Sequence, residues 1–457
     1  MLHMKSYHSI CLLICCIPVY LLAQTNKSLV SGPWAGNVEL RTAMVWAEVS
    51  KNVKSVAVKY YPINNSKSIQ TVAYEGALGK AFNPVKIALN GLEFGTAYQY
   101  QLIIDGKPVT TAFETKFQTQ DLWQYRKPAP DFSFLAGSCA YFNESVFDRP
   151  GGGYGGDSSI FETMAKTPAD FNIWLGDNWY TREVDYGSEW GLNYRASRDR
   201  SLAVLQPFMA KMPQYAIWDD HDYGPNDAGK SYLLKEASRE VFKNYSLNPT
   251  YGEDGKGIYT KISYGDADFF LTDDRYFRAD DKLPDSINGM PNPEKEFFGS
   301  RQMEWLKNAL LFSRATFKFI VTGSQVLNPL NKYECLRDYP VDYHGLLDFL
   351  SAQKINGVLF LTGDRHHSEV IRTDRPSLYP LFDITVSPLT AGVSKASGIE
   401  ANNPYRELNT LVEAHNFARL SISGKKNERV LMVEYLGIRG DKLGQWSVRE
   451  TELRASK

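Results

Sequence analysis

The sequence predicts two folded parts, an all-β sandwich followed by an α/β domain. From Gly32 to about Gln118, apolar and polar residues alternate with the period of two that is typical of half-buried strands. Beyond this stretch, short apolar runs alternate with segments whose apolar residues recur at helical spacing. At 457 residues the chain is also longer than one hydrophobic core usually allows, so we expect more than one domain.

Residues 1–23 have the pattern of a secretory signal peptide. A lysine precedes an apolar run that is shorter than the ~20 residues needed to span a bilayer. We expect cleavage after Ala23, and a lipid anchor at Cys15 or Cys16 is the alternative. The mature protein is therefore predicted to be exported to the periplasm or secreted, without a transmembrane anchor.

Charge and cysteine content limit the partners. The formal net charge is -1, so no basic field attracts nucleic acid, which is not an expected partner. A small anionic substrate fits, because bound metal ions can supply positive charge locally. Outside the predicted signal peptide only Cys139 and Cys335 remain, which leaves one disulfide open in an oxidising compartment. We expect a monomer.

The predicted sandwich comprises residues 32–118. It contains Trp46, a tyrosine-rich stretch GTAYQYQL from Gly95 and a turn at Asp105 and Gly106. These features, over about 90 residues, are similar to a fibronectin type III or immunoglobulin-like sandwich. A segment rich in proline and charge follows and is predicted to be a linker.

The α/β domain is expected to comprise residues 131–440. Helical patterns lie at 158–166, 230–245 and 301–312. Further strand signals at 258–264, 267–272, 381–387 and 429–435 favour two packed mixed sheets flanked by helices over one parallel sheet. The strand-like apolar runs are Phe132–Ala136, Phe171–Leu175, Tyr215–Trp218, Phe317–Thr322 and Val358–Thr362.

Four of these runs lead into residues that can bind metal ions. Ligands of α/β sheets bind at the carboxyl ends of the strands, so we expect the four loops to converge. The stretch WDDHD, Trp218–Asp222, places three carboxylates and an imidazole at the end of a buried strand, which is costly unless a cation compensates them. The other three segments are Gly137–Cys139, Gly176–Tyr180 and Gly363–His367.

The types of donor predict a mixed metal site. Carboxylates and imidazoles suit several metals, whereas the Cys139 thiolate and the Tyr180 phenolate favour iron or zinc. Asp177, on a tight turn after a strand, is the candidate to bridge two metals. Two adjacent ions can hold a hydroxide and clamp the oxygens of a displacement at phosphorus, so the pattern predicts hydrolysis of a phosphate ester.

Four motifs in this order resemble the PhoD-like alkaline phosphatases, a family of the calcineurin-like metallophosphoesterases. The resemblance covers most of the mature chain. It implies an exported metal-dependent enzyme that hydrolyses phosphate mono- and diesters with a metal-bound hydroxide. The motifs are GSC at Gly137, GDNWY at Gly176, WDDHD at Trp218 and GDRH at Gly363.

The resemblance also implies roles for single residues. Cys139 and Tyr180 would bind a ferric ion, which Asp177 would bridge to a second metal. Iron and calcium are the implied ions, and zinc, manganese and magnesium are the alternatives. The remaining implied ligands are Asp220, Asp364 and His366.

Three further residues are candidates for work on the substrate. His221 would protonate the leaving oxygen. Arg275 and Asn178 would contact the substrate phosphate, although Asp273 and Asp274 offer Arg275 a structural ion pair instead.

Two other functions remain open, a catalytically inactive exported binding protein and a metallohydrolase of another ester class. The intact WDDHD and GDRH motifs argue against the first. Asp222 stands where the family usually has glutamate, which leaves the number of calcium ions open. The glycine-rich segment Gly151–Gly156 lacks the ending of a phosphate-binding loop and is expected to shape access near Cys139.

Overall fold

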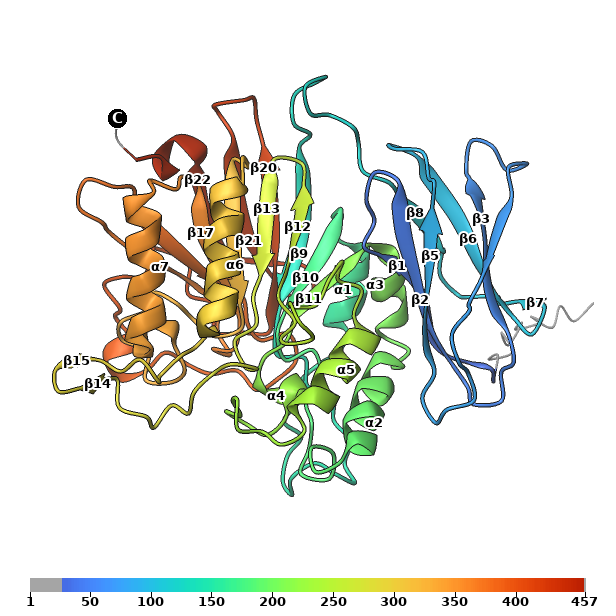
Figure 1. Cartoon of the computed structure of the whole chain (residues 1–457), viewed down its shortest axis with the longest axis horizontal. Helices are drawn as coiled ribbons and strands as arrows, with labels where there is room; N and C mark the ends of the chain where they lie inside the picture. Colours follow the sequence, from blue (N-terminus) through green and yellow to red (C-terminus); the bar gives the residue numbers. More distant parts are fainter. Residues whose placement is uncertain (1–26, 456–457) are drawn as a thin grey trace, which may run out of the picture.

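A computed structural model of the chain describes residues 27–455 (Figure 1). The predicted signal peptide lies outside the described residues. Strands β1 to β8 come first, and the seven α-helices of the described part all follow β9. None of these helices has the length and apolar character needed to cross a membrane.

Residues 29–118 form two antiparallel sheets around their own core. Strands β1, β2 and β5 make one sheet, and β3, β4, β6, β7 and β8 make the other. The predicted alternation is visible in β5, where Val85, Ile87 and Leu89 are buried between more exposed neighbours. The strands are β1 (Leu29–Gly36), β2 (Thr42–Val49), β3 (Val56–Pro62), β4 (Gln70–Ala73), β5 (Pro84–Asn90), β6 (Ala97–Ile104), β7 (Lys107–Pro108) and β8 (Lys116–Gln118).

Two six-stranded mixed sheets form the larger part, as the sequence predicts. All five apolar runs predicted to be strands are strands. In the first sheet β9 (Phe132–Gly137), β10 (Phe171–Leu175) and β11 (Gln214–Ile217) are parallel, and β20 (Asn416–Ser423), β21 (Val430–Gly437) and β22 (Lys442–Arg449) continue it antiparallel. The second sheet has the order β12 (Thr260–Tyr264), β13 (Ala267–Leu271), β16 (Phe317–Thr322), β17 (Val358–Thr362), β19 (Leu381–Thr385), β18 (Glu369–Thr373).

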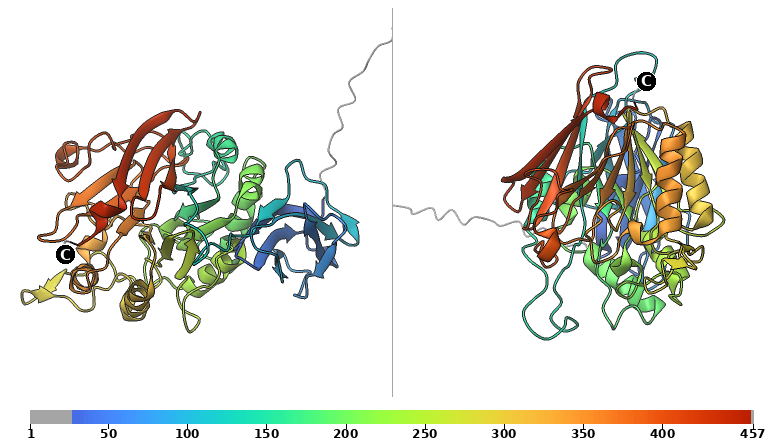
Figure 2. Two further views of the ribbon diagram at one scale, coloured as in Figure 1. Left: turned by 90° about the horizontal axis from the view of Figure 1, so that it is seen from above. Right: turned by 90° about the vertical axis from the view of Figure 1, so that its left-hand side faces the viewer.

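The two sheets stack face to face. Phe134 on β9 meets Phe269 and Phe319 of the other sheet at ring-centroid distances of 5.0 and 5.6 Å. Helices α6 and α7 lie on one outer side of the stack, and strands β20 to β22 lie on the other (Figure 2). The helices are α1 (Ile160–Lys166), α2 (Glu189–Arg200), α3 (Gln206–Lys211), α4 (Asp220–Tyr223), α5 (Lys235–Tyr245), α6 (Gly299–Phe312) and α7 (Pro340–Ala352).

Short elements complete the larger part. A two-stranded hairpin connects β13 to α6, and three 3-10 turns lie in the second half of the chain. These elements are β14 (Ser286–Ile287), β15 (Met290–Pro291), η1 (Leu336–Asp338), η2 (Gly398–Glu400) and η3 (Glu450–Leu453).

The sheet of β1, β2 and β5 packs against the larger part. Trp34 and Trp46 stack at 3.9 Å and belong to the hydrophobic core of the larger part, not to that of the sandwich. The Trp46 indole donates a hydrogen bond of 2.7 Å to the carbonyl oxygen of Asn244 on α5. The sequence analysis used Trp46 as a mark of the sandwich, but its side chain is part of the contact between the two regions.

Candidate metal centre

The four polar loops converge, as the strand order requires. Cys139 follows β9, Asp177 follows β10 and His366 follows β17, and ligand atoms of these three lie within 4.8 Å of one another. Asp177, Asp220 and His221 form a second group within the same distance, with Asp220 beginning α4 directly after β11. Asp177 belongs to both groups, so its two carboxylate oxygens can serve two neighbouring ions.

Four candidate ligands have a left-handed backbone. The φ angles of Cys139, Asp177, Asp364 and His366 are 60, 52, 61 and 57°. Residues with a Cβ rarely adopt this region, and when they do the cost is often borne at functional sites. Here each of the four residues lies in the turn that follows a buried strand, β9, β10 or β17.

Cys139 is buried and not oxidised. Its Sγ lies 3.1 Å from the Ser387 hydroxyl and 3.4 Å from the Ser138 hydroxyl. Burial, reinforced by Asp364, raises the pKa of the Cys139 thiol to about 11. A thiolate at neutral pH therefore needs a bound cation. Cys139 and Cys335 are both free, so the disulfide left open by the sequence does not form in this structure.

Tyr180 and His366 complete the first group. The Tyr180 hydroxyl donates to Asp177 Oδ2 at 2.9 Å and lies 3.5 Å from His366 Nε2. His366 Nδ1 lies 2.5 Å from the carbonyl oxygen of Gly392. Because a carbonyl oxygen only accepts, Nδ1 carries the hydrogen and Nε2 keeps a lone pair for a metal. Burial and the nearby Asp177 raise the pKa of Tyr180 well above its usual range.

The carboxylates of the site are in an environment that disfavours two adjacent negative charges. Burial raises the pKa of Asp177 well above its usual value, and Cys139 and Asp220 add to the effect. Burial also opposes ionisation of Asp220, but His221 and Arg275 outweigh it and lower the pKa of Asp220 to about 2. This accumulation of acids fits a site that binds cations.

His221 lies where it can reach both a ligand and a substrate. Its Nε2 is 3.9 Å from Asp220 Oδ2, its ring stacks on Tyr180 at 4.1 Å, and it lines the adjoining cavity. Burial lowers the pKa of His221, with Asp220 opposing. The imidazole is thus held in place by stacking while one edge stays open.

The other two acids of WDDHD are structural. Asp219 accepts from Arg275 Nε at 2.6 Å. Asp222 accepts from the backbone nitrogens of Asp219 and Asn178 at 2.6 and 2.9 Å and caps the first turn of α4. These bonds fix the turn that presents Asp220 and His221.

Arg275 and Asn178 do not reach the cavity. Arg275 is fully buried and forms ion pairs with Asp219 and Glu334, rather than with its neighbours in sequence. The Asn178 amide donates to the carbonyl oxygen of Ile217 at 2.8 Å. Within residues 27–455, neither belongs to the cavity lining, because both side chains are used to hold the strand-end turns.

A cavity of about 840 Å³ opens beside both groups. Its lining includes the predicted residues Asp177, Asp220, His221, Asp364 and His366. The Asp364 carboxylate lies outside both ligand groups of the described residues, although burial raises its pKa to about 6. The structure therefore places Asp364 on the cavity wall, close enough to Cys139 and Asp177 to raise their pKa values, and its role as a metal ligand stays a prediction.

The glycine-rich segment lies at this cavity. Tyr154 lines it, with its hydroxyl 3.2 Å from His366 Nδ1 and its ring 4.9 Å from that of Tyr141. The prediction that this segment lies near the Cys139 motif is confirmed. Sequence patterns did not identify Tyr154 itself, because one tyrosine among 27 carries no signal without its position in space.

The stacked mixed sheets, with their ligand groups at the strand ends, define a fold of the metallophosphoesterase type. A solved structure of PhoD superimposes with a TM-score of 0.72, covering 94% of this chain and 93% of that chain at 19% identity. Purple acid phosphatase PPD1 from yellow lupin (Lupinus luteus) seeds gives a TM-score of 0.66, covering 91% and 74% at 12% identity. At these identities the likeness shows the fold alone.

The chain belongs to the PhoD-like phosphatase family, whose model matches residues 134–427. The resemblance inferred from the four motifs is confirmed. Alkaline phosphatase D of Bacillus subtilis (strain 168) is 24% identical over an alignment of 330 residues, and the match covers 62% of this chain and 53% of that protein. The chain thus matches about half the length of this relative. Residues 26–122 match a second family, described as a domain of unknown function (DUF7800).

Proposed function

We propose that the protein is an exported, metal-dependent phosphoesterase that hydrolyses phosphate mono- and diesters. The observation that carries the proposal is Asp177, which belongs to two adjoining groups of ligand atoms beside an open cavity. Membership of the PhoD-like phosphatase family supports the same chemistry. Metal dependence follows from the donors themselves, because the buried acids and thiol are unfavourable as anions without cations.

The donor atoms suit two different ions. Cys139, Tyr180 and His366 offer sulfur, phenol oxygen and nitrogen, which favour iron, while Asp220 and Asp364 offer the carboxylate oxygens that calcium prefers. Zinc, manganese and magnesium are the alternatives. When bound, a pair of ions supplies the positive charge that activates water and stabilises the phosphoryl oxygens.

The chain's own residues orient the reaction and supply its proton. His221 Nε2 donates the proton to the leaving oxygen, since its ring is fixed on Tyr180 and its edge faces the cavity. The Gly392 carbonyl keeps the His366 ring in one orientation. Asp219 and Asp222 hold the turn that carries Asp220 and His221.

The proposal also assigns an identity or a role to each part of the chain. Residues 32–118 form a fibronectin type III or immunoglobulin-like domain. Residues 131–440, continued by β22 at Lys442–Arg449, form the catalytic domain. Residues 1–23 direct export to the periplasm or the medium. Cell fractionation with and without residues 1–23 tests the last point, and cytoplasmic retention of the full chain would contradict it.

The central test combines metal analysis with activity. We expect two bound metals per chain and hydrolysis of p-nitrophenyl phosphate and bis(p-nitrophenyl) phosphate that chelators abolish. Ferric iron bound by a thiolate or phenolate gives a visible charge-transfer band, which tests the iron assignment. Activity on p-nitrophenyl acetate alone would instead favour a metallohydrolase of another ester class, and no activity with metals bound would favour a binding protein.

A further inference from the structure

Part of the cavity lining has no task in the proposed chemistry. It comes from three segments, around Lys332, after Asp364 and at 394–400. The first and the last lie beside each other, because Lys332 Nζ would be 3.7 Å from a Cβ placed on Gly398. The last also adjoins the metal centre, since the Ser394 backbone nitrogen donates to the His366 carbonyl oxygen at 2.9 Å.

Arg365 contributes a guanidinium that is buried but not fully bonded. Its Nη2 donates to both carboxylate oxygens of Glu400, at 2.8 and 2.9 Å, and its face lies 5.0 Å from the Tyr333 ring. Its Nε is buried and has no hydrogen-bond partner within the described part of the chain. Arg365 lines the cavity and is only 6% exposed, so leaving its buried Nε without a partner is costly unless an acceptor reaches it.

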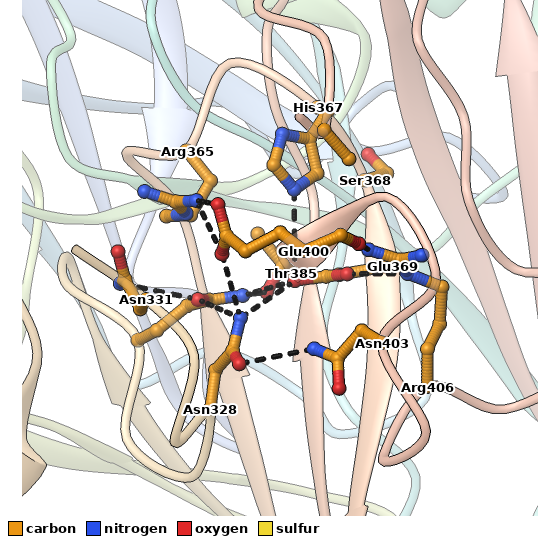
Figure 3. A network of polar contacts seen from close by, with 12 residues as sticks. Asn328, Asn331, Arg365, His367, Ser368, Glu369, Thr385, Glu400, Asn403 and Arg406 are labelled. Atoms are coloured by element: carbon orange, nitrogen blue, oxygen red, sulfur yellow. Dashed lines mark hydrogen bonds and ion pairs between the residues drawn. The ribbon is translucent and has the colours of Figure 1, made fainter. Parts of the chain in front are cut away.

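His367 is also buried beside a glutamate and also has nitrogen atoms without a hydrogen-bond partner in the described part of the chain. It is 2% exposed, its Nε2 faces Glu369 at 3.5 Å, and neither ring nitrogen has a hydrogen-bond partner among residues 27–455. Glu369 is fixed from the other side by Arg406 at 2.7 Å. Asn328 donates to Glu369 and to Glu400, both at 3.2 Å, so one buried network supports His367 and Arg365 together (Figure 3).

Two lysines add charge to this wall. Lys332 and Lys395 line the cavity, and neither forms an ion pair with any described residue. Several acids of the lining are paired, since Asp281 and Glu334 pair with Arg278, Asp285 with Lys295 and Glu400 with Arg365. Asp227 and Asp338 also line the cavity and form no ion pair among the described residues. Among the described residues of the lining, Lys332 and Lys395 are the lysines without an ion pair, and Arg365 keeps one unpaired donor.

We propose that Lys332, Lys395, Arg365 and His367 bind a second anionic group of the substrate, a phosphate or carboxylate on the part that leaves. The proposal rests on the proposed phosphoesterase function and narrows its substrates to esters whose leaving alcohol carries its own negative charge. An anion there accepts from the free Arg365 Nε and from the lysines. It lies next to the metal centre without competing for the metal ligands.

The test compares matched phenyl phosphates on the full-length, metal-loaded protein. One leaving phenol is uncharged, one bears a carboxylate and one bears a phosphonate. The last two distinguish a carboxylate from a phosphate as the anionic group that is bound. We expect kcat/KM for the charged esters to exceed that for the uncharged ester roughly tenfold. In the variant Lys332→Ala/Lys395→Ala this ratio should fall towards one.

The control is Lys425→Ala/Lys426→Ala, two exposed lysines in the β20–β21 connection away from the cavity lining. It should keep the wild-type ratio. A wild-type ratio near one, or a ratio that the Lys332/Lys395 variant leaves intact, would overturn the proposal.

A separate binding measurement tests the anion site if the proposed phosphoesterase function is wrong. If the wild type hydrolyses none of the three esters, calorimetric titration with a non-hydrolysable phosphonate analogue of the carboxylated ester is decisive. Weaker binding to Lys332→Ala/Lys395→Ala than to the wild type would keep the anion site and reject only the phosphoesterase. Equal binding would reject the anion site.

Discussion

Two regions of this molecule bury carboxylates, and their surroundings differ. At the contact between the sandwich and the larger part, Glu48 accepts from Ser197 at 2.9 Å and Tyr245 at 3.0 Å, amid apolar side chains. At the metal centre, Asp177 lies among Cys139 and other acids. Burial raises both pKa values, so a raised pKa alone does not mark a site. Asp177 differs from Glu48 because it belongs to two groups of ligand atoms that lie within 4.8 Å of one another.

The largest effect is expected for Asp177→Asn. Loss of the shared oxygen charge should remove at least one metal and lower kcat/KM by about 10³-fold or more. Without metals the variant should be more stable than the wild type. Burial raises the pKa of Asp177, so near neutral pH the wild type gains a free ionised carboxylate only on unfolding, and asparagine does not. Metal analysis, kinetics and thermal unfolding in chelator check this. Asp374→Asn, at an exposed acid, is the matched control, and an apo variant less stable than apo wild type would contradict the argument.

The second-largest effect is expected for His221→Ala, which distinguishes a general acid from a metal ligand at the same centre. His221→Ala should lower kcat by about 10²- to 10⁴-fold with both metals retained, because a general acid contributes that much. The loss should be larger for an alkyl phosphate than for p-nitrophenyl phosphate, whose leaving group needs no proton. Steady-state kinetics with both substrates and metal analysis check this. Loss of a metal would make His221 a ligand instead.

Substitutions in the contact region should change the free energy of unfolding and not the catalysed reaction. Trp46→Ala removes a fully buried indole from the core of the larger part and should cost about 3–5 kcal/mol of unfolding free energy. Trp46→Phe should cost less, since it keeps much of the packing and loses the bond to Asn244. Urea unfolding measures both. A loss below about 1 kcal/mol for Trp46→Ala would mean that the two regions do not stabilise each other.

The smallest effect is a pH dependence at the contact. Burial, opposed by Ser197 and Tyr245, raises the pKa of Glu48 from 4.5 to about 7. The folded protein therefore keeps a proton that the unfolded chain loses, so stability falls as pH rises from about 4.5 to 7 and is level above. At pH above 7, Glu48→Gln should be more stable than wild type by up to roughly 3 kcal/mol. Unfolding at several pH values checks this, and equal stability at all of them would contradict it.

The sequence predicted the strands and the convergence of their loops because both follow from local patterns. Apolar runs that end in acids mark strand ends, and parallel strands bring those ends together. The partners of single side chains were not predictable. Trp46 sits in an alternating strand, and alternation defines two faces without saying what covers the outer one. Arg275 pairs with Glu334, 59 residues away, although two acids adjoin it in sequence.

Helix α2 was not predicted at all. Its buried face includes Arg195, Asp199 and Arg200, so the apolar periodicity that reveals other helices is absent. The sequence also did not predict the left-handed backbone of the candidate ligands, because their residue types do not require that conformation. The prediction that Asp364 is a ligand stays a prediction, since the structure places this residue on the cavity wall but outside the two groups whose ligand atoms all lie within 4.8 Å of one another.

The left-handed turns at the strand ends bear on how metals enter and leave. They are tied to one another at the ends of adjacent strands, for example by the Ala140 nitrogen donating to the Asp177 carbonyl oxygen at 2.9 Å. The sheets therefore fix these turns before any ion arrives, and loading needs little rearrangement of the chain. Exchange of one ion for another should then be limited by passage through the cavity rather than by unfolding. The kinetics of metal uptake by folded apoprotein would be fast compared with refolding.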